Sequence, residues 1–121
     1  MKIIMKKLTK TFKALSDSNR IRILKMLEVR PLCVCEITEV LGLATSTVSK
    51  HLSILRDAEF ILDKKDGKWV NYYLNNKEDN EYINKLSQLL KLFLIHDDII
   101  KKDGQSLNHM DRNQICRTYE K

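Results

Sequence analysis

The chain of 121 residues has little glycine and proline, with three of the first and one of the second. Long flexible linkers need more of both, so we expect one domain of modest size. No apolar run approaches the roughly 20 residues that a membrane-spanning helix needs. The first residues also lack the apolar core and the small-residue cleavage site of a secretory signal. These absences argue against a membrane or secreted protein and favour a cytoplasmic one.

Cysteine is scarce as well, and the chain has only Cys33, Cys35 and Cys116. An odd and small number argues against a disulfide framework and favours metal or redox chemistry. Thiolates prefer soft or borderline ions. The spacing predicts that Cys33 and Cys35 stand at a helix N-terminus, where the positive end of the helix dipole favours the thiolate.

The spacing of Cys33 and Cys35 sets a geometric condition. Residues two apart on a regular helix lie about 200° apart around its axis. Two such sulfurs cannot hold one ion, so either Cys33 lies just outside the helix or binding unwinds the first turn. In both cases we expect an ion at these sulfurs to disturb the helix that follows.

Positive charge is abundant and unevenly distributed. Residues 1–75 hold 14 basic and 8 acidic residues, whereas residues 76–121 hold 8 of each, so the whole net charge of +6 lies in the first part. Such a distribution favours binding of a polyanion to the first two thirds of the chain. Charge alone leaves open a basic surface that is merely solvated.

The apolar periodicity predicts two helices before Pro31 and two short helices after it. The first short helix spans about residues 33–41, and Gly42 provides the turn. Thr45 or Ser46 is the expected N-cap of the next helix, which runs to about residue 58. Two short helices joined at a glycine are typical of a helix-turn-helix.

Two β-prone segments at 60–65 and 68–74 flank Asp66-Gly67, which predicts a hairpin, or wing, after the second short helix. A long helix is expected from about Glu78 to Lys102, with a broad apolar stripe. A second copy of the chain would cover this stripe, although packing on the chain's own first helix remains an alternative. The expected fold is therefore mainly α with a small β-hairpin, a winged helix-turn-helix that forms homodimers through its first and last helices.

We divide the chain into a winged-helix DNA-binding and dimerisation domain (1–103) and a polar C-terminal tail (104–121), which we expect to be mobile or to depend on a partner for its order.

Hydroxyls and cations on the second short helix and the wing are suited to base edges and phosphates. N-capping is the alternative role for the hydroxyls, and His51 could instead brace the helix pair. The candidate DNA-binding residues are Thr45, Ser46, Thr47, Ser49, Lys50, His51, Arg56, Lys64, Lys65 and Lys68.

The segments LCVCEI (32–37), STVSKHLSILR (46–56) and DGKWVNYYL (66–74) resemble the ArsR/SmtB family of metal-responsive repressors. The resemblance covers about residues 5–100. It implies a winged-helix homodimer, with no enzyme activity and no organic cofactor. Such a dimer binds double-stranded operator DNA and releases it when a metal or metalloid binds.

Arsenic-sensing members of the family carry a third cysteine three residues after the second, and this chain has Thr38 there. Cys116 is the remaining thiol, so it is either the third ligand or a bystander. The candidate metal ligands are thus Cys33, Cys35 and Cys116. The expected inducer is trivalent arsenic or antimony, As(III) or Sb(III), with other thiophilic ions left open.

Other functions are also considered. Zinc sensors of the family use Asp/His and His/Glu pairs on the last helix, a spacing that His96, Asp97, Asp98 and His109 do not match. A redox-sensing repressor could use the pair Cys33 and Cys35 without metal. A thiol-exchange enzyme would leave the helix-turn-helix and the wing unexplained.

Overall fold

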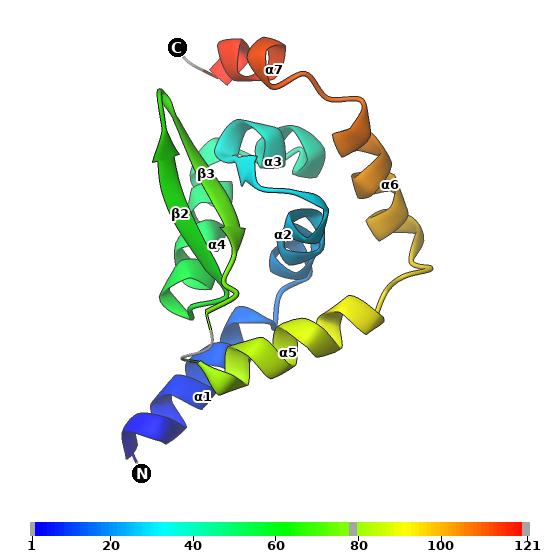
Figure 1. Cartoon of the computed structure of the whole chain (residues 1–121). Coiled ribbons are helices and arrows are strands. Elements are labelled where there is room, and N and C mark those ends of the chain that lie inside the picture. Colours follow the sequence, from blue (N-terminus) through cyan, green and yellow to red (C-terminus); the bar gives the residue numbers. More distant parts are fainter. Residues whose placement is uncertain (1, 78–79, 120–121) are drawn as a thin grey trace.

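The computed structural model describes residues 2–77 and 80–119 (Figure 1). The expected helix start at Glu78 lies outside the described residues. No helix in the described ranges has both the length and the apolar character needed to cross a bilayer. The elements, in chain order, are α1 (Lys2–Ala14), α2 (Ser18–Val29), β1 (Leu32–Cys33), α3 (Val34–Leu41), α4 (Thr45–Asp57), β2 (Ile61–Asp66), β3 (Trp69–Leu74), α5 (Glu81–Leu92), α6 (Asp98–Asn108) and α7 (Arg112–Tyr119).

The helix-turn-helix consists of α3 and α4, as predicted. Gly42 ends α3 with a φ of 67°, a left-handed conformation that glycine adopts without a Cβ penalty. The apolar residues expected to point inward are buried in the core, among them Ile37, Val48, Leu52 and Leu55. Burying this face fixes α4 against α2 and α3 and leaves its opposite face to solvent.

The wing is the hairpin of β2 and β3, and β1 extends it into a three-stranded antiparallel sheet of order β1-β3-β2. One detail of the prediction was wrong by a residue: Asp66 pairs with Trp69 across the ladder, so Gly67 and Lys68 form the turn. Gly67 has a φ of 60° at the first central position, as in a type II′ turn. In β1, Cys33 pairs with Asn71 of β3, so the first thiol lies in the same sheet as the wing.

The long helix expected to reach Lys102 is broken in the structure. Its first part, α5, ends at Leu92, and Leu94 adopts a left-handed φ of 63°. The side chain of Asp97 then accepts hydrogen bonds from the backbone N–H groups of Ile99 and Ile100 and starts α6. Local capping therefore outweighs apolar periodicity at this point.

The described part of the expected polar tail is helical. α6 continues across the boundary drawn after residue 103, and its Leu107 is buried in the core. Asp103 is also buried, and its two carboxylate oxygens each accept a hydrogen bond of 2.9 Å from Arg22 of α2. Beyond α6, α7 packs against α3 near the end of the wing (Figure 1).

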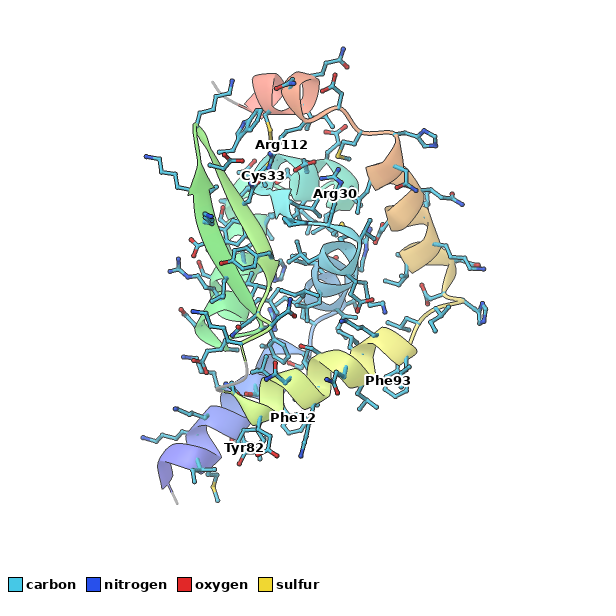
Figure 2. All side chains as sticks on the ribbon, in the orientation of Figure 1. Phe12, Arg30, Cys33, Tyr82, Phe93 and Arg112 are labelled. Atoms are coloured by element: carbon cyan, nitrogen blue, oxygen red, sulfur yellow. A yellow bond between two sulfur atoms is a disulfide. The ribbon has the colours of Figure 1, made fainter. Side chains whose placement is uncertain are left out.

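Apolar side chains remain exposed on α1 and α5, which lie at the end of the molecule opposite α7 (Figure 1), with the start of α5 near α1. Figure 2 shows Phe12, Tyr82 and Phe93 on this side. Ile83 of the expected stripe is buried in the chain's own core, whereas Tyr82, Leu89 and Phe93 remain 43%, 46% and 53% exposed, so packing within the chain covers only part of the stripe. We call this surface the α1–α5 face; its residues are Ile4, Met5, Phe12, Tyr82, Leu89, Leu92 and Phe93.

Candidate thiol site and nucleic-acid interface

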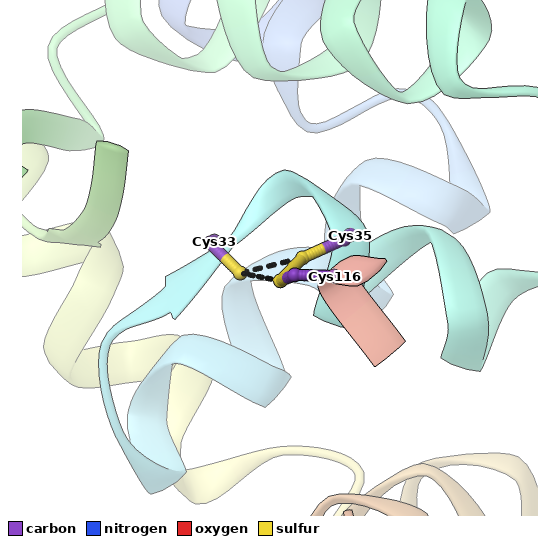
Figure 3. Close-up of side chains that lie close together, drawn as sticks. All are labelled: Cys33, Cys35 and Cys116. Carbon is purple, nitrogen blue, oxygen red and sulfur yellow. Dashed lines mark hydrogen bonds between the residues drawn. A yellow bond between two sulfur atoms is a disulfide. The ribbon is translucent and has the colours of Figure 1, made fainter. Parts of the chain in front are cut away.

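The structure brings all three cysteine sulfurs together, and we call this group the thiol triad (Figure 3). The Sγ atoms lie within 4.8 Å of one another. Cys35 and Cys116 are joined by a disulfide, with Cα atoms 5.5 Å apart, and Cys33 is a buried free thiol. Its sulfur lies 2.9 Å from that of Cys35 and 3.4 Å from that of Cys116.

The position of Cys33 answers the geometric question raised by its spacing from Cys35. Cys33 is the N-cap of α3, with extended φ and ψ of −92° and 168°, and so lies outside the helix. Its side chain can therefore turn toward that of Cys35 in the first turn. Unwinding of the helix, the alternative expectation, is not needed for the two sulfurs to meet.

The disulfide corrects one expectation. The redox alternative paired Cys33 with Cys35. The structure instead joins Cys35 to Cys116 across 81 residues of sequence. The pairing follows from tertiary packing, because α7 lies against α3 and presents a buried Cys116 to its first turn.

The electrostatic environment of Cys33 also differs from the expectation. Burial raises the pKa of its thiol, and the nearby Glu36 carboxylate adds to this, against the lowering effect of hydrogen bonds from the Glu36 backbone N–H and from Arg112. The helix N-terminus was expected to favour the thiolate. Removal of the sulfur from water outweighs that effect here, because a buried anion loses its hydration.

Glu36 organises the residues around the triad. Its side chain is 1% exposed, and Oε1 accepts a hydrogen bond of 3.0 Å from the backbone N–H of Cys33, as in a capping box. Oε2 accepts a 2.8 Å hydrogen bond from Arg30, and Nε of Arg112 lies 3.4 Å from Oε1. Burial alone would raise the pKa of Glu36, but the hydrogen bonds with Cys33 and Arg30 and the charge of Arg30 lower it overall. The carboxylate therefore stays ionised while buried beside the thiols.

Within the described residues, the triad is the single group of three or more cysteine, histidine or acidic side chains close enough to share an ion. The residues weighed for a zinc site do not form one there. Asp97 caps α6 at its N-terminus, and His109 follows its last turn. Thr38, which replaces the third cysteine of arsenic sensors, is 3% exposed, and its Oγ1 has no hydrogen-bond partner in the described part of the chain.

Of the candidate DNA-binding residues, those of the first turns of α4 and those of the wing turn face solvent. Ala44, rather than a hydroxyl residue, is the N-cap of α4, so the proposed capping role of Thr45 or Ser46 was wrong. Both hydroxyls lie inside the first turn. The exposed residues are Thr45, Ser46, Thr47, Ser49, Lys50, Arg56, Lys64, Lys65 and Lys68.

His51 and Arg56 make contacts within the chain. His51 Nδ1 lies 3.2 Å from the Nη1 atom of Arg20, which links α4 to α2 and is the bracing role left open by the sequence. Arg56 donates a 3.1 Å hydrogen bond to Asp63, which ties α4 to the wing. These contacts help to orient the surface that the exposed residues form.

Three contact residues were missed by the sequence reasoning. Arg30, Asn71 and Arg112 surround Glu36 and Cys33, yet they come from three separate segments. Only the four-residue spacing of Arg112 and Cys116 could have indicated that the two share a helix face.

A family model described as "Bacterial regulatory protein, arsR family" matches residues 17–62. The arsenical resistance operon repressor of Bacillus subtilis (strain 168) is 40% identical over 78 residues, which are 64% of this chain and 74% of that protein. That of Escherichia coli (strain K12) is 42% identical over 65 residues, 53% of this chain. The chain spans 56% of the length of this second relative.

Among solved structures, a homodimeric winged helix-turn-helix DNA-binding domain from Mycobacterium bovis matches with a TM-score of 0.64. The match is 21% identical and covers 74% of this chain and 80% of that domain, so it establishes the fold. All these relatives are described as regulators of transcription. Together with the helix-turn-helix and the wing, they show that this chain belongs to the ArsR family of winged helix-turn-helix regulatory proteins.

Proposed function

We propose that this protein is a dimeric repressor that binds operator DNA and releases it when As(III) or Sb(III) binds the reduced thiol triad. The observation that carries the proposal is the convergence of three sulfurs within 4.8 Å, a group that includes no histidine or acidic side chain of the described residues. An all-thiolate donor set selects thiophilic ions. The relatives named as arsenical resistance operon repressors support the choice of ion.

The fold supports a direct connection between this site and the DNA-binding surface. Cys33 pairs with Asn71 in the sheet that includes the wing, and Cys35 lies in α3, which packs against α4. In our proposal residues 104–121 supply the third thiol through Cys116. An ion that holds the three sulfurs would fix α7 on α3 and shift both the wing and α4 relative to DNA.

The DNA-binding surface in this proposal consists of the exposed hydroxyls and Lys50 of α4, with the wing lysines on neighbouring phosphates. The second protomer would bind through the α1–α5 face. Its exposed apolar side chains support this arrangement, as does the homodimeric state of the similar domain from Mycobacterium bovis. A two-fold dimer would present two copies of α4 to successive major grooves.

The test starts with an operator selected from a random duplex library, with binding followed by fluorescence anisotropy. For the reduced protein we expect arsenite to weaken operator binding by about tenfold or more, in the usual range of allosteric coupling. The variants Cys33→Ser, Cys35→Ser and Cys116→Ser should each lose most of this response while still binding the operator. An undiminished arsenite response in all three variants would rule out the triad as the inducer site.

A redox-sensing repressor is the second candidate, and the disulfide between Cys35 and Cys116 favours it. Its formation removes two electrons and two protons from the two thiols, which hydrogen peroxide can accept. Titration of the same protein–operator complex with arsenite and with hydrogen peroxide separates the candidates. Release by peroxide alone would favour the redox function, and release by arsenite under reducing conditions would favour ion sensing.

A further inference from the structure

Arg112 lies where the thiol triad, the wing and α3 meet. It is the first residue of α7, and Figure 2 shows it close to Cys33. Its Nη2 donates a hydrogen bond to Oδ1 of Asn71, and the guanidinium carbon lies 4.5 Å from the centre of the Trp69 ring. One side chain of α7 thus contacts two residues of β3.

The other contacts of Arg112 lead back to the thiols. Its Nε lies 3.4 Å from Oε1 of Glu36, the same oxygen that accepts the backbone N–H of Cys33. The side chain of Arg112 is only 24% exposed, so these contacts are partly shielded from water. Shielding strengthens charge-assisted and cation–π interactions relative to those of a surface arginine.

Asn71 extends these contacts into the wing. It is the β-sheet partner of Cys33, and its side-chain Nδ2 donates a 3.3 Å hydrogen bond to Asp66, next to the turn. Arg112 therefore bonds to the wing residue that is paired with a triad cysteine. A displacement of Arg112 would therefore also move β3, the strand that it contacts.

From these contacts we propose that Arg112 is a positioning residue that couples the state of the thiol triad to the wing. Arg112 and Cys116 are one turn apart on the same face of α7. When the Cys116 sulfur is held at α3, by an ion or by the disulfide, Arg112 is held against Trp69 and Asn71. When Cys116 is released, the guanidinium loses its alignment and the wing is freed. The case in which an ion holds Cys116 rests on the proposed function above, whereas the case of the disulfide does not.

The guanidinium is well suited to this task. Its planar fork bonds Asn71 while its face stacks on the indole, and lysine cannot do both at once. Arg112→Met keeps the apolar stem but removes the charge and the fork, whereas Arg112→Lys keeps the charge beside Glu36. Lys101→Met is the matched control, because Lys101 is an exposed cation of α6. Circular dichroism establishes that each variant is folded.

Trp69 is the only tryptophan of the chain and therefore reports on the wing directly. Its emission is recorded for the full-length reduced protein before and after arsenite, and separately after diamide, which oxidises two thiols to a disulfide and takes up the two electrons and protons. Bound arsenic is measured by equilibrium dialysis, and disulfide formation by mass spectrometry.

We expect both arsenite binding and diamide oxidation to change the Trp69 emission of the wild type. In Arg112→Met, at equal arsenic or disulfide content, the change in emission should be at most about one fifth as large. Arg112→Lys should give an intermediate change and Lys101→Met the full one. An equal change in Arg112→Met, or no change in the wild type after either closure, would overturn the coupling. Failure of the wild type to take up arsenic would instead overturn the proposed inducer, and the diamide experiment would still decide the role of Arg112.

Discussion

Thr38 and Cys116 together define the chemistry of the thiol triad. Thr38 occupies the position three residues after Cys35, where a side chain on the same helix face could reach an ion held by Cys35. Its hydroxyl is a poor ligand for a thiophilic ion. Cys116 provides a sulfur from α7 in its place, 3.4 Å from that of Cys33. In the proposed site the third ligand therefore comes from a distant segment of the chain rather than from α3.

If Cys116 takes the place of a third cysteine at position 38, a cysteine at that position should restore arsenite binding that is lost with Cys116. Cys116→Ser should weaken arsenite binding by about tenfold or more, since loss of a ligand costs at least as much as loss of an outer-shell partner. Adding Thr38→Cys in the same chain should restore most of the affinity, measured by equilibrium dialysis of the reduced protein. Thr38→Ser with Cys116→Ser is the matched control and should remain weak. If the cysteine gave no more affinity than the serine, the third ligand would not lie in this region.

At the scale of elements, the helix N-termini divide into capped and uncapped ones. Asp17 caps α2 by accepting hydrogen bonds from the backbone N–H groups of Asn19 and Arg20, and Asp97 does the same for α6. Ala44 offers no side-chain acceptor at the start of α4. The helix proposed to enter the DNA groove therefore keeps the N–H groups of its first turn available to an external acceptor.

The cap of α2 predicts a pH dependence of stability. Burial alone would raise the pKa of Asp17. The two backbone hydrogen bonds, together with the electrostatic effects of the His51 and Arg20 side chains, lower it overall. Its stabilising effect is thus present above the ordinary carboxyl pKa and is lost as the pH falls through the lowered value. Asp17→Asn should keep most of the stability at pH 7 but remove this part of the acid sensitivity, in urea unfolding at pH 7 and pH 3. Asp17→Ala should cost about 1 kcal/mol at pH 7; equal stability of Ala and Asp variants would contradict the cap.

The uncapped start of α4 predicts opposite effects on folding and on DNA binding. Ala44→Asp should stabilise the protein by about 0.5–1 kcal/mol through a new cap. The same charge should weaken binding to duplex DNA, because it repels the phosphates that the first turn faces in the proposed complex. Ala44→Ser provides the cap without the charge and is the control. Unchanged DNA affinity of the aspartate variant would place the N-terminus of α4 away from the phosphates.

On the whole molecule, the two surfaces with proposed functions lie far apart. The thiol triad and α7 lie at one end, and the α1–α5 face lies at the other (Figure 2). All three sulfurs of the triad come from one chain, so in the proposed function ion binding needs no residue from a partner. We therefore expect one arsenic per chain in both monomer and dimer.

The α1–α5 face predicts the effect of a single charge on assembly. Phe12→Glu should weaken the dimer by about 30-fold or more, as at other buried aromatic anchors, measured by sedimentation equilibrium. Ile54→Glu, at an exposed apolar residue of α4, is the control and should leave the dimer intact. Arsenic uptake per chain should be the same in both variants. If Phe12→Glu kept the wild-type dimer, the interface would lie elsewhere.

Sequence alone determined the helix-turn-helix, the wing and the family, because these depend on local signals. Apolar spacing places Val48, Leu52 and Leu55 on one face, Gly42 permits the left-handed turn, and Gly67 permits the hairpin. The break after α5 was missed, since the left-handed Leu94 and the Asp97 cap compete with a continuing apolar stripe.

Tertiary structure decided how the thiols are arranged. No local pattern brings Cys116 to Cys35 across 81 residues, or Arg112 to Asn71 and Trp69. The burial that raises the pKa of Cys33 likewise depends on packing between segments of the chain. Motifs are fixed by neighbours along the chain, which the sequence displays, whereas the position of Cys116 beside the other two thiols and the contact of Arg112 with the wing depend on packing between segments that are distant in sequence.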